Sequence, residues 1–203
     1  MPAQPAPPQW YGFRPPPAPP QSPWAAFPPP NGGYLITPMF GRLAANSLNL
    51  TNNWTVIAPM VFPWDLTFDR VGVHVATAVA STSVYPLVYE ADEWGLPTRL
   101  IRNWGAIAST STGLKELVVD DTLPAGVYWI GLLQTGGATV ALRSATNTFP
   151  WNSSGSNAAA NAGRIDISSG STPVPVLFGG QRVASSGSDQ APVVLFRARS
   201  YVQ

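Results

Sequence analysis

Cysteine is absent from the chain, and histidine occurs once, at His74. Without cysteine neither disulfides nor thiolate metal sites can form, and a single histidine excludes most zinc sites and multi-histidine catalytic triads. Charged residues make up only 10% of the sequence and the formal net charge is +1. Composition therefore gives no electrostatic reason to expect nucleic acid or an acidic membrane as a partner, and we expect no metal and no cofactor.

Long apolar runs and the common catalytic motifs are also missing. No run of 18 apolar residues could form a membrane-spanning helix, and residues 1–5 lack the basic and apolar regions of a secretory signal. The sequence contains no Gly-x-Ser-x-Gly elbow, phosphate loop or dinucleotide fingerprint. These absences predict a non-enzymatic protein that does not insert into a membrane.

Proline and glycine are abundant, with 23 and 18 residues in a chain of 203. Thirteen of the prolines lie in residues 1–30, where Arg14 is the only charge. Proline fixes φ and removes hydrogen-bond donors, so this stretch favours an extended polyproline II path. Five aromatic residues lie between the prolines and are expected to anchor in pockets of a partner: Trp10, Tyr11, Phe13, Trp24 and Phe27. Residues 1–33 are thus predicted to be an extended docking arm, with a flexible tail as the alternative.

Residues 34–203 have the pattern of an all-β domain. Short apolar stretches recur about every ten residues with turn residues between them, which is typical of an antiparallel β-sandwich, here of jelly-roll type. The strands are expected at 54–62, 66–75, 83–90, 98–104, 114–119, 127–134, 138–143, 164–168, 174–178 and 193–202. Leu66 and Phe68 alternate out of step with Val71, so the register must break near Asp69, at a bulge or a strand start.

A long polar excursion interrupts the domain at residues 151–172. It consists mostly of Asn, Ser, Gly and Ala, with only the short strand 164–168 inside it. Such a segment has little to bury, so we expect it at a tip or rim of the sandwich.

Few side chains suit catalysis. Glu90, Asp92 and Glu93 cluster before a turn, where carboxylates could bind Ca²⁺ or act as a glycosidase pair, but Asp is also common in polar hairpin turns and we favour that interpretation. Asp120 and Asp121 are adjacent, and neighbouring strand residues point to opposite faces. His74 alternates with valines and is expected at the surface or rim.

Binding residues are easier to nominate. Trp94 lies in the expected loop beside three carboxylates, and an exposed indole with hydrogen-bonding neighbours suits sugar stacking. The alternative is an indole folded back over the hairpin. Trp151 opens the polar excursion, and the same two interpretations apply. Glycan-binding candidates are therefore Trp94, Glu90, Asp92 and Trp151, whereas Trp54, Trp104 and Trp129 lie in apolar strands and are expected in the core.

Between residues 67 and 129 the sequence resembles a β-sandwich module of phage virion proteins, of the tail-fibre, head-fibre, decoration or receptor-binding type. The segments with this resemblance are 67–73, 77–80, 88–92, 95–97, 111–116 and 123–129. The resemblance implies a location on the virion surface, a distal domain whose N-terminus is tethered to other virion proteins, and a homo-oligomer, a trimer above all. The arm at residues 1–30 and the bulky acidic loop at Glu93 and Trp94 depart from the module.

These observations predict a structural phage protein, a fibre- or spike-type appendage that contacts a host-surface glycan. A capsid or neck decoration protein without a receptor role is the alternative. Two further hypotheses have less support: a polysaccharide-degrading enzyme using Glu90, Asp92 or Asp120, and a ligand for an SH3-type module with Pro15–Pro20 as bait.

Overall fold

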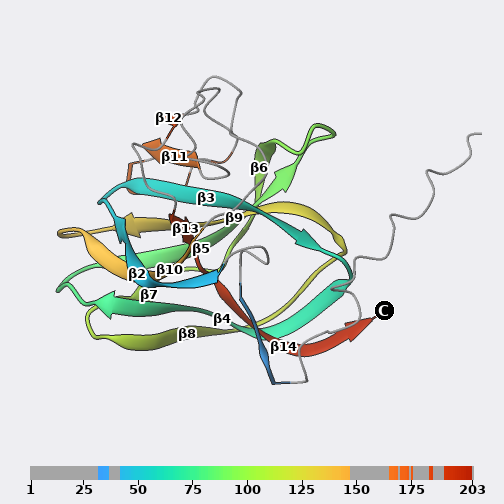
Figure 1. Cartoon of the computed structure of the whole chain (residues 1–203), viewed down its shortest axis with the longest axis horizontal. Coiled ribbons are helices and arrows are strands. Elements are labelled where there is room, and N and C mark those ends of the chain that lie inside the picture. The colour runs from blue at the N-terminus through green and yellow to red at the C-terminus, as the bar shows by residue number, and fades with distance from the viewer. Residues whose placement is uncertain are drawn as a thin grey trace, which may run out of the picture.

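A computed structural model describes residues 32–36, 42–146, 165–168, 170–173, 175, 183–184 and 190–202. The regular secondary structure in these residues consists of β-strands, which are joined by turns and loops, and all strand pairings are antiparallel. The strands form two sheets, seen in Figure 1 with β3 and β6 towards the top and β4, β8 and β14 towards the bottom. The predicted all-β class is confirmed. No helix in the described part is long and apolar enough to cross a membrane.

Sheet 1 is organised around one long strand. Its members are β1 (Tyr34–Ile36), β2 (Arg42–Leu50), β4 (Asp65–Thr77), β8 (Gly113–Leu123), β10 (Val140–Thr146), β13 (Gln190–Pro192) and β14 (Leu195–Val202). β4 pairs with β8 along one edge and with β14 and then β10 along the other. β1 adds to the outer edge of β14, and β2 and β13 pair with β10.

Sheet 2 has the order β12-β11-β3-β9-β5-β6, with β7 also paired to β5. Its strands are β3 (Trp54–Phe62), β5 (Ser83–Ala91), β6 (Pro97–Asn103), β7 (Ile107–Ala108), β9 (Gly126–Thr135), β11 (Ile165–Ser168) and β12 (Val183–Ala184). Strands β5 and β6 are joined by the turn 92–96, and this β5–β6 hairpin projects from the body of the molecule (Figure 1).

The sequence predicted β3 with its correct ends and located β4, β5, β6, β8, β9, β10, β11 and β14, with ends that differ by a few residues. It missed β2, whose Asn, Ser and Ala residues have low intrinsic strand preference, and the short strands β1, β7, β12 and β13. The strand expected at 174–178 lies outside the described residues except for Pro175.

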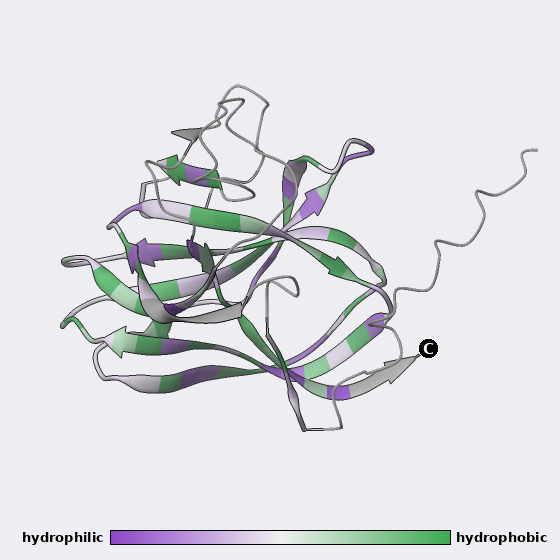
Figure 2. Cartoon of the chain, in the orientation of Figure 1, coloured by the Kyte–Doolittle hydropathy of each residue, from purple (hydrophilic) through white to green (hydrophobic). Residues whose placement is uncertain are grey.

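The two sheets share one hydrophobic core. Buried side chains from sheet 1, such as Phe68, Val71 and Phe196, belong to the same cluster as Met60 and Phe62 of sheet 2. Phe196 contacts Phe62, Phe68 and Trp104 edge-on, with ring centroids 6.0, 4.9 and 5.7 Å away. Edge-to-face geometry is favourable for aromatic rings beyond the area they bury. Figure 2 shows hydrophobic residues interspersed with polar ones along β4 and β8 of sheet 1, and a longer hydrophobic stretch along β3 of sheet 2.

The predicted break of register near Asp69 is confirmed as a bulge. The pairing of β4 with β8 shifts between Phe68 and Arg70, so Leu66, Phe68 and Val71 all reach the core although their spacing is uneven. Asp69 and Arg70 are both left outside the core, half-buried. The bulge therefore places two adjacent charged residues on the outside of sheet 1.

The outward side of sheet 2 is also apolar. Ile57, Leu87, Tyr89, Trp129 and Leu133 form a second buried cluster there, which includes Ile165 and Ile167 of β11. Within the polar excursion, which was expected at a tip or rim, the described strand β11 pairs with β3 beside the end strand β12, and Ile165 and Ile167 are buried in this cluster. Residues 151–164 lie outside the described residues. Leu100 N–H donates to Pro175 O at 2.9 Å, so Pro175 also lies against this sheet.

Candidate binding site

The turn of the β5–β6 hairpin is fixed by Asp92. The backbone N–H of Asp92 donates to Leu96 O (2.8 Å), and Gly95 N–H donates to Asp92 O (2.9 Å). The Asp92 carboxylate accepts from the backbone N–H groups of Trp94 (3.0 Å) and Leu96 (2.7 Å). Gly95 has a φ of 78°, which an L side chain rarely adopts. Asp92 is thus a turn-forming residue, as the favoured interpretation of the acidic cluster requires.

Trp94 projects from this turn into solvent. Its side chain is 75% exposed, so the alternative of an indole folded back over the hairpin is wrong. One residue further on, Gly95 O accepts a 2.8 Å hydrogen bond from Nε1 of Trp129, which is buried on β9. This bond joins the turn to the body of sheet 2. The exposed indole therefore sits on a braced backbone, which lowers the entropy that binding would cost.

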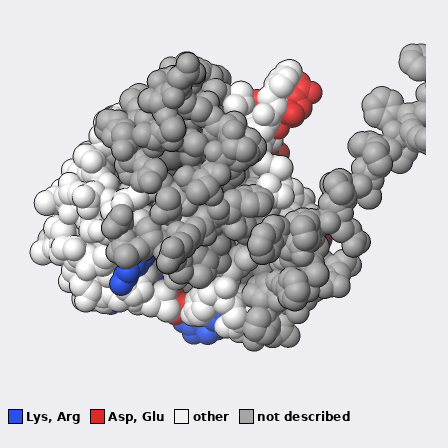
Figure 3. All heavy atoms as spheres, viewed as in Figure 1, with Lys and Arg blue, Asp and Glu red and all other residues white. Residues whose placement is uncertain are grey.

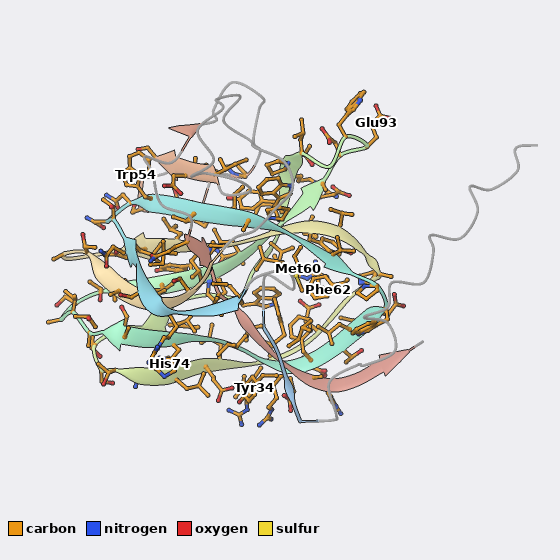
Figure 4. The ribbon with its side chains drawn as sticks, in the orientation of Figure 1. Tyr34, Trp54, Met60, Phe62, His74 and Glu93 are labelled. Carbon is orange, nitrogen blue, oxygen red and sulfur yellow. The ribbon has the colours of Figure 1, made fainter. Side chains whose placement is uncertain are left out.

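Glu90 lies at the base of the hairpin and is exposed. Its carboxylate accepts from Arg99 of β6 at 3.1 and 3.3 Å, and Thr98 Oγ1 donates to Glu90 O at 3.1 Å. An exposed pair of this kind contributes little to stability, so its main effect is to set local charge. In Figure 3 the carboxylate atoms visible on the molecule gather mainly at this hairpin, around the Glu93 labelled in Figure 4.

The structure does not bring the carboxylates of the enzyme hypothesis together. Glu90 pairs with Arg99 and Asp92 binds backbone amides on sheet 2, whereas Asp120 pairs with Arg199 at 3.1 Å on the outside of sheet 1. Among the described residues no group of three metal-ligating side chains could hold a metal ion.

Asp121 links the two sheets. It lies next to Asp120 on β8 but on the opposite face, as strand alternation predicts, and its Oδ2 accepts from Arg102 Nε (2.7 Å) and Trp104 Nε1 (2.9 Å). Its Oδ1 accepts from Thr122 N–H at 2.8 Å. Burial alone would raise the pKa of Asp121, but these hydrogen bonds and the Arg102 charge outweigh burial and hold the pKa below 3.8.

We expect Asp121→Ala to lower the free energy of unfolding at neutral pH by about 2 kcal/mol, because Arg102 and Trp104 lose their shared acceptor. A group whose folded pKa is lowered stabilises the fold above its unfolded pKa, 3.8, and loses that contribution as the pH falls through the folded pKa. The difference between wild type and variant should therefore shrink as the pH is lowered from 7 to below 3.8 in urea titrations. Asp120→Ala, which removes only an exposed pair, is the control. A difference that stays constant with pH would contradict the assignment.

The outer face of sheet 1, the side turned away from the shared core, is covered by charged and aromatic side chains from β1, β14, β4 and β8. Arg197 donates to both carboxylate oxygens of Asp69 at 2.7 and 2.6 Å, and Tyr34 Oη donates to Glu116 at 2.6 Å. The hydrogen bond from Tyr34 on β1 to Glu116 on β8 crosses β14 and β4 and passes over Gly72. A Cβ at Gly72 would lie 3.1 Å from Glu116 Cγ, so a larger residue there would crowd the Glu116 side chain. Figure 4 shows Tyr34 and His74 on this lower side, away from Met60 and Phe62.

The pKa directions on this face follow the contacts. The hydrogen bond to Glu116 raises the pKa of Tyr34, and the Arg197 hydrogen bonds lower that of Asp69. His74, which was expected at the surface or rim, is half-buried on β4 and pairs in register with Leu114 of β8.

The predictions for the other tryptophans have mixed outcomes. Trp129 is buried, as expected, and Trp104 is half-buried against the shared core. Trp54 is only half-buried and belongs to neither cluster. Trp151 and the five aromatics of the arm, Trp10, Tyr11, Phe13, Trp24 and Phe27, lie outside the described residues.

The sequence matches no protein-family model, and no curated protein matches it.

Proposed function

We propose that the chain is a non-enzymatic structural protein of a phage virion, docked by residues 1–33 to other virion proteins and exposing a jelly-roll β-sandwich at the virion surface. Two antiparallel sheets around a common core support the sandwich. The composition of residues 1–30, with thirteen prolines and five aromatics, supports the docking role.

Host-surface glycan is the proposed ligand of the outer end, and the exposed indole of Trp94 is the observation that supports it. The exposed indole offers a large, rigid contact area, and its flat face suits the apolar face of a sugar ring. The turn that holds Trp94 is fixed by Asp92 and by the Trp129–Gly95 hydrogen bond. The site is thus pre-organised, with Glu90 and Glu93 beside it as hydrogen-bond acceptors.

Replacing Trp94 by alanine should lower binding to the host-cell surface, or to the responsive sugars of a glycan array, by at least about tenfold, the size expected for a central aromatic contact. The unfolding midpoint should stay unchanged because the side chain is exposed. Trp94→Phe should keep part of the binding, and Val127→Ala, on the exposed end of β9, is the control with full binding.

Absent glycan binding by the wild type, together with particles that lose heat stability when the protein is missing, would replace the receptor role by decoration. Release of reducing ends from a host capsule, lost in Glu90→Gln, would overturn the non-enzymatic assignment.

A further inference from the structure

The outer face of sheet 1 has its charges divided between two flanks. β14 contributes Arg197 and Arg199, β8 on the other side of β4 contributes Glu116 and Asp120, and β4 between them contributes Asp65, Asp69 and Arg70. The face is therefore basic along β14 and acidic along β8.

Apolar side chains accompany the acidic flank. Val118 is 76% exposed and Leu114 is 42% exposed, and both lie on the same face of β8 as Glu116. Val118 occupies a row that crosses four strands, in register with Arg70, Arg197 and Tyr34. A strand that ends a sheet usually avoids such exposed apolar residues, because they invite association.

The outermost ion pair is weakly held within one copy. Arg199 and Asp120 have side chains 61% and 78% exposed, and an exposed pair of this kind contributes little to stability. Both residues can exchange their partners for those of a neighbouring molecule at little cost.

We infer that this face is the contact between copies of the chain, with the basic β14 flank of one copy against the acidic β8 flank of the next. A contact between two different flanks is heterologous, and such contacts close into a ring when the rotation allows. Val118 lies in the centre of this contact, and Arg199 of one copy meets Asp120 of its neighbour. The inference rests on the proposed function, for which the resemblance to phage virion modules implies a trimer, and deepens it by naming the surface that joins the copies.

The purified full chain tests the inference by sedimentation equilibrium at micromolar concentration. Wild type should have three times the mass of one chain. Val118→Asp adds a buried carboxylate to the acidic flank and should weaken association at least tenfold. Val127→Asp, at a valine that is 44% exposed on the outside of sheet 2, should leave the mass unchanged. Thermal melting of the two variants, followed by circular dichroism, distinguishes loss of folding from loss of association.

Charge exchange tests the partner residues. Asp120→Arg should weaken the oligomer, and combining it with Arg199→Asp should restore the oligomer by recreating the pair with opposite polarity. A wild-type chain that is monomeric at these concentrations, or an oligomer indifferent to Val118→Asp, overturns the inference. A third result would also overturn the inference: a wild-type chain that is monomeric in solution, with a Val118→Asp variant that fails to enter particles. The face would then contact another virion protein and not a second copy of the chain. None of these results depends on glycan binding or on the arm, so the proposed function fails or stands separately.

Discussion

Replacing Phe196 by alanine is expected to lower the free energy of unfolding by about 3–5 kcal/mol, the usual range for a fully buried phenylalanine. Phe196 is 0% exposed and its ring contacts three others, from Phe62 of sheet 2, Phe68 of sheet 1 and Trp104 after β6. Its loss leaves a cavity where the two sheets meet, so neither sheet can close it alone. Single domains are commonly stable by 5–15 kcal/mol, and this variant would lose a large share.

Urea denaturation followed by tryptophan fluorescence measures the effect. Phe196→Leu keeps most of the volume and should lose about 1 kcal/mol, whereas Val127→Ala removes exposed methyl groups and should change stability by less than about 0.5 kcal/mol. A loss below about 1 kcal/mol for Phe196→Ala would contradict a core shared by the two sheets.

Removal of residues 1–30 is expected to reduce the number of copies in assembled particles at least tenfold, while the unfolding midpoint of the purified chain stays unchanged. The strands of both sheets come from residues 34 onward, so the shared core remains complete without the arm. Several aromatic anchors, each contributing about 2 kcal/mol or more when buried in a partner, account for the size of the loss.

Two substitution variants separate anchoring from reach. Exchanging the five aromatics for serine should reproduce the deletion: Trp10, Tyr11, Phe13, Trp24 and Phe27. Exchanging the five prolines between residues 15 and 20 for alanine keeps the anchors and should reduce copy number far less. Quantitative mass spectrometry of purified particles gives the count, and a truncated chain present at wild-type copy number would refute docking by the arm.

Much of the fold was predictable from local pattern. Strand alternation is a property of neighbouring residues, so β3 was found with both ends, and the uneven spacing of Leu66, Phe68 and Val71 revealed the bulge at Asp69. β2 was missed because Asn46, Ser47 and Asn49 favour turns, and its strand conformation depends on pairing with β10, about a hundred residues away. β11 was found, but the burial of its Ile165 and Ile167 in one cluster with Tyr89 and Trp129 depends on tertiary contact.

The site was predictable to a similar degree. Three carboxylates followed by Trp and Gly indicated a turn, and its type was right, because Asp92 binds amides only two and four residues away. The exposure of Trp94 had two possible outcomes that only the structure separates. The brace from Trp129 to Gly95 spans 34 residues, and the link from Asp121 to Arg102 and Trp104 joins different sheets. The local sequence pattern does not predict either contact.

The attachment of β1 decides how tension on the arm would enter the protein. Residues before Gly32 pull on a short strand that lies antiparallel to β14 in three register pairs, with two further backbone bonds between Gly32 or Gly33 and Ala198. A pull along β1 loads these hydrogen bonds together, in shear. The hydrogen bond from Tyr34 to Glu116 adds a link from β1 to β8, at the far edge of the sheet. If the protein is tethered by its arm, a force on the arm would therefore load the C-terminal strand β14 and its neighbours first. The hairpin with Trp94 lies on the other sheet and would carry little of this force.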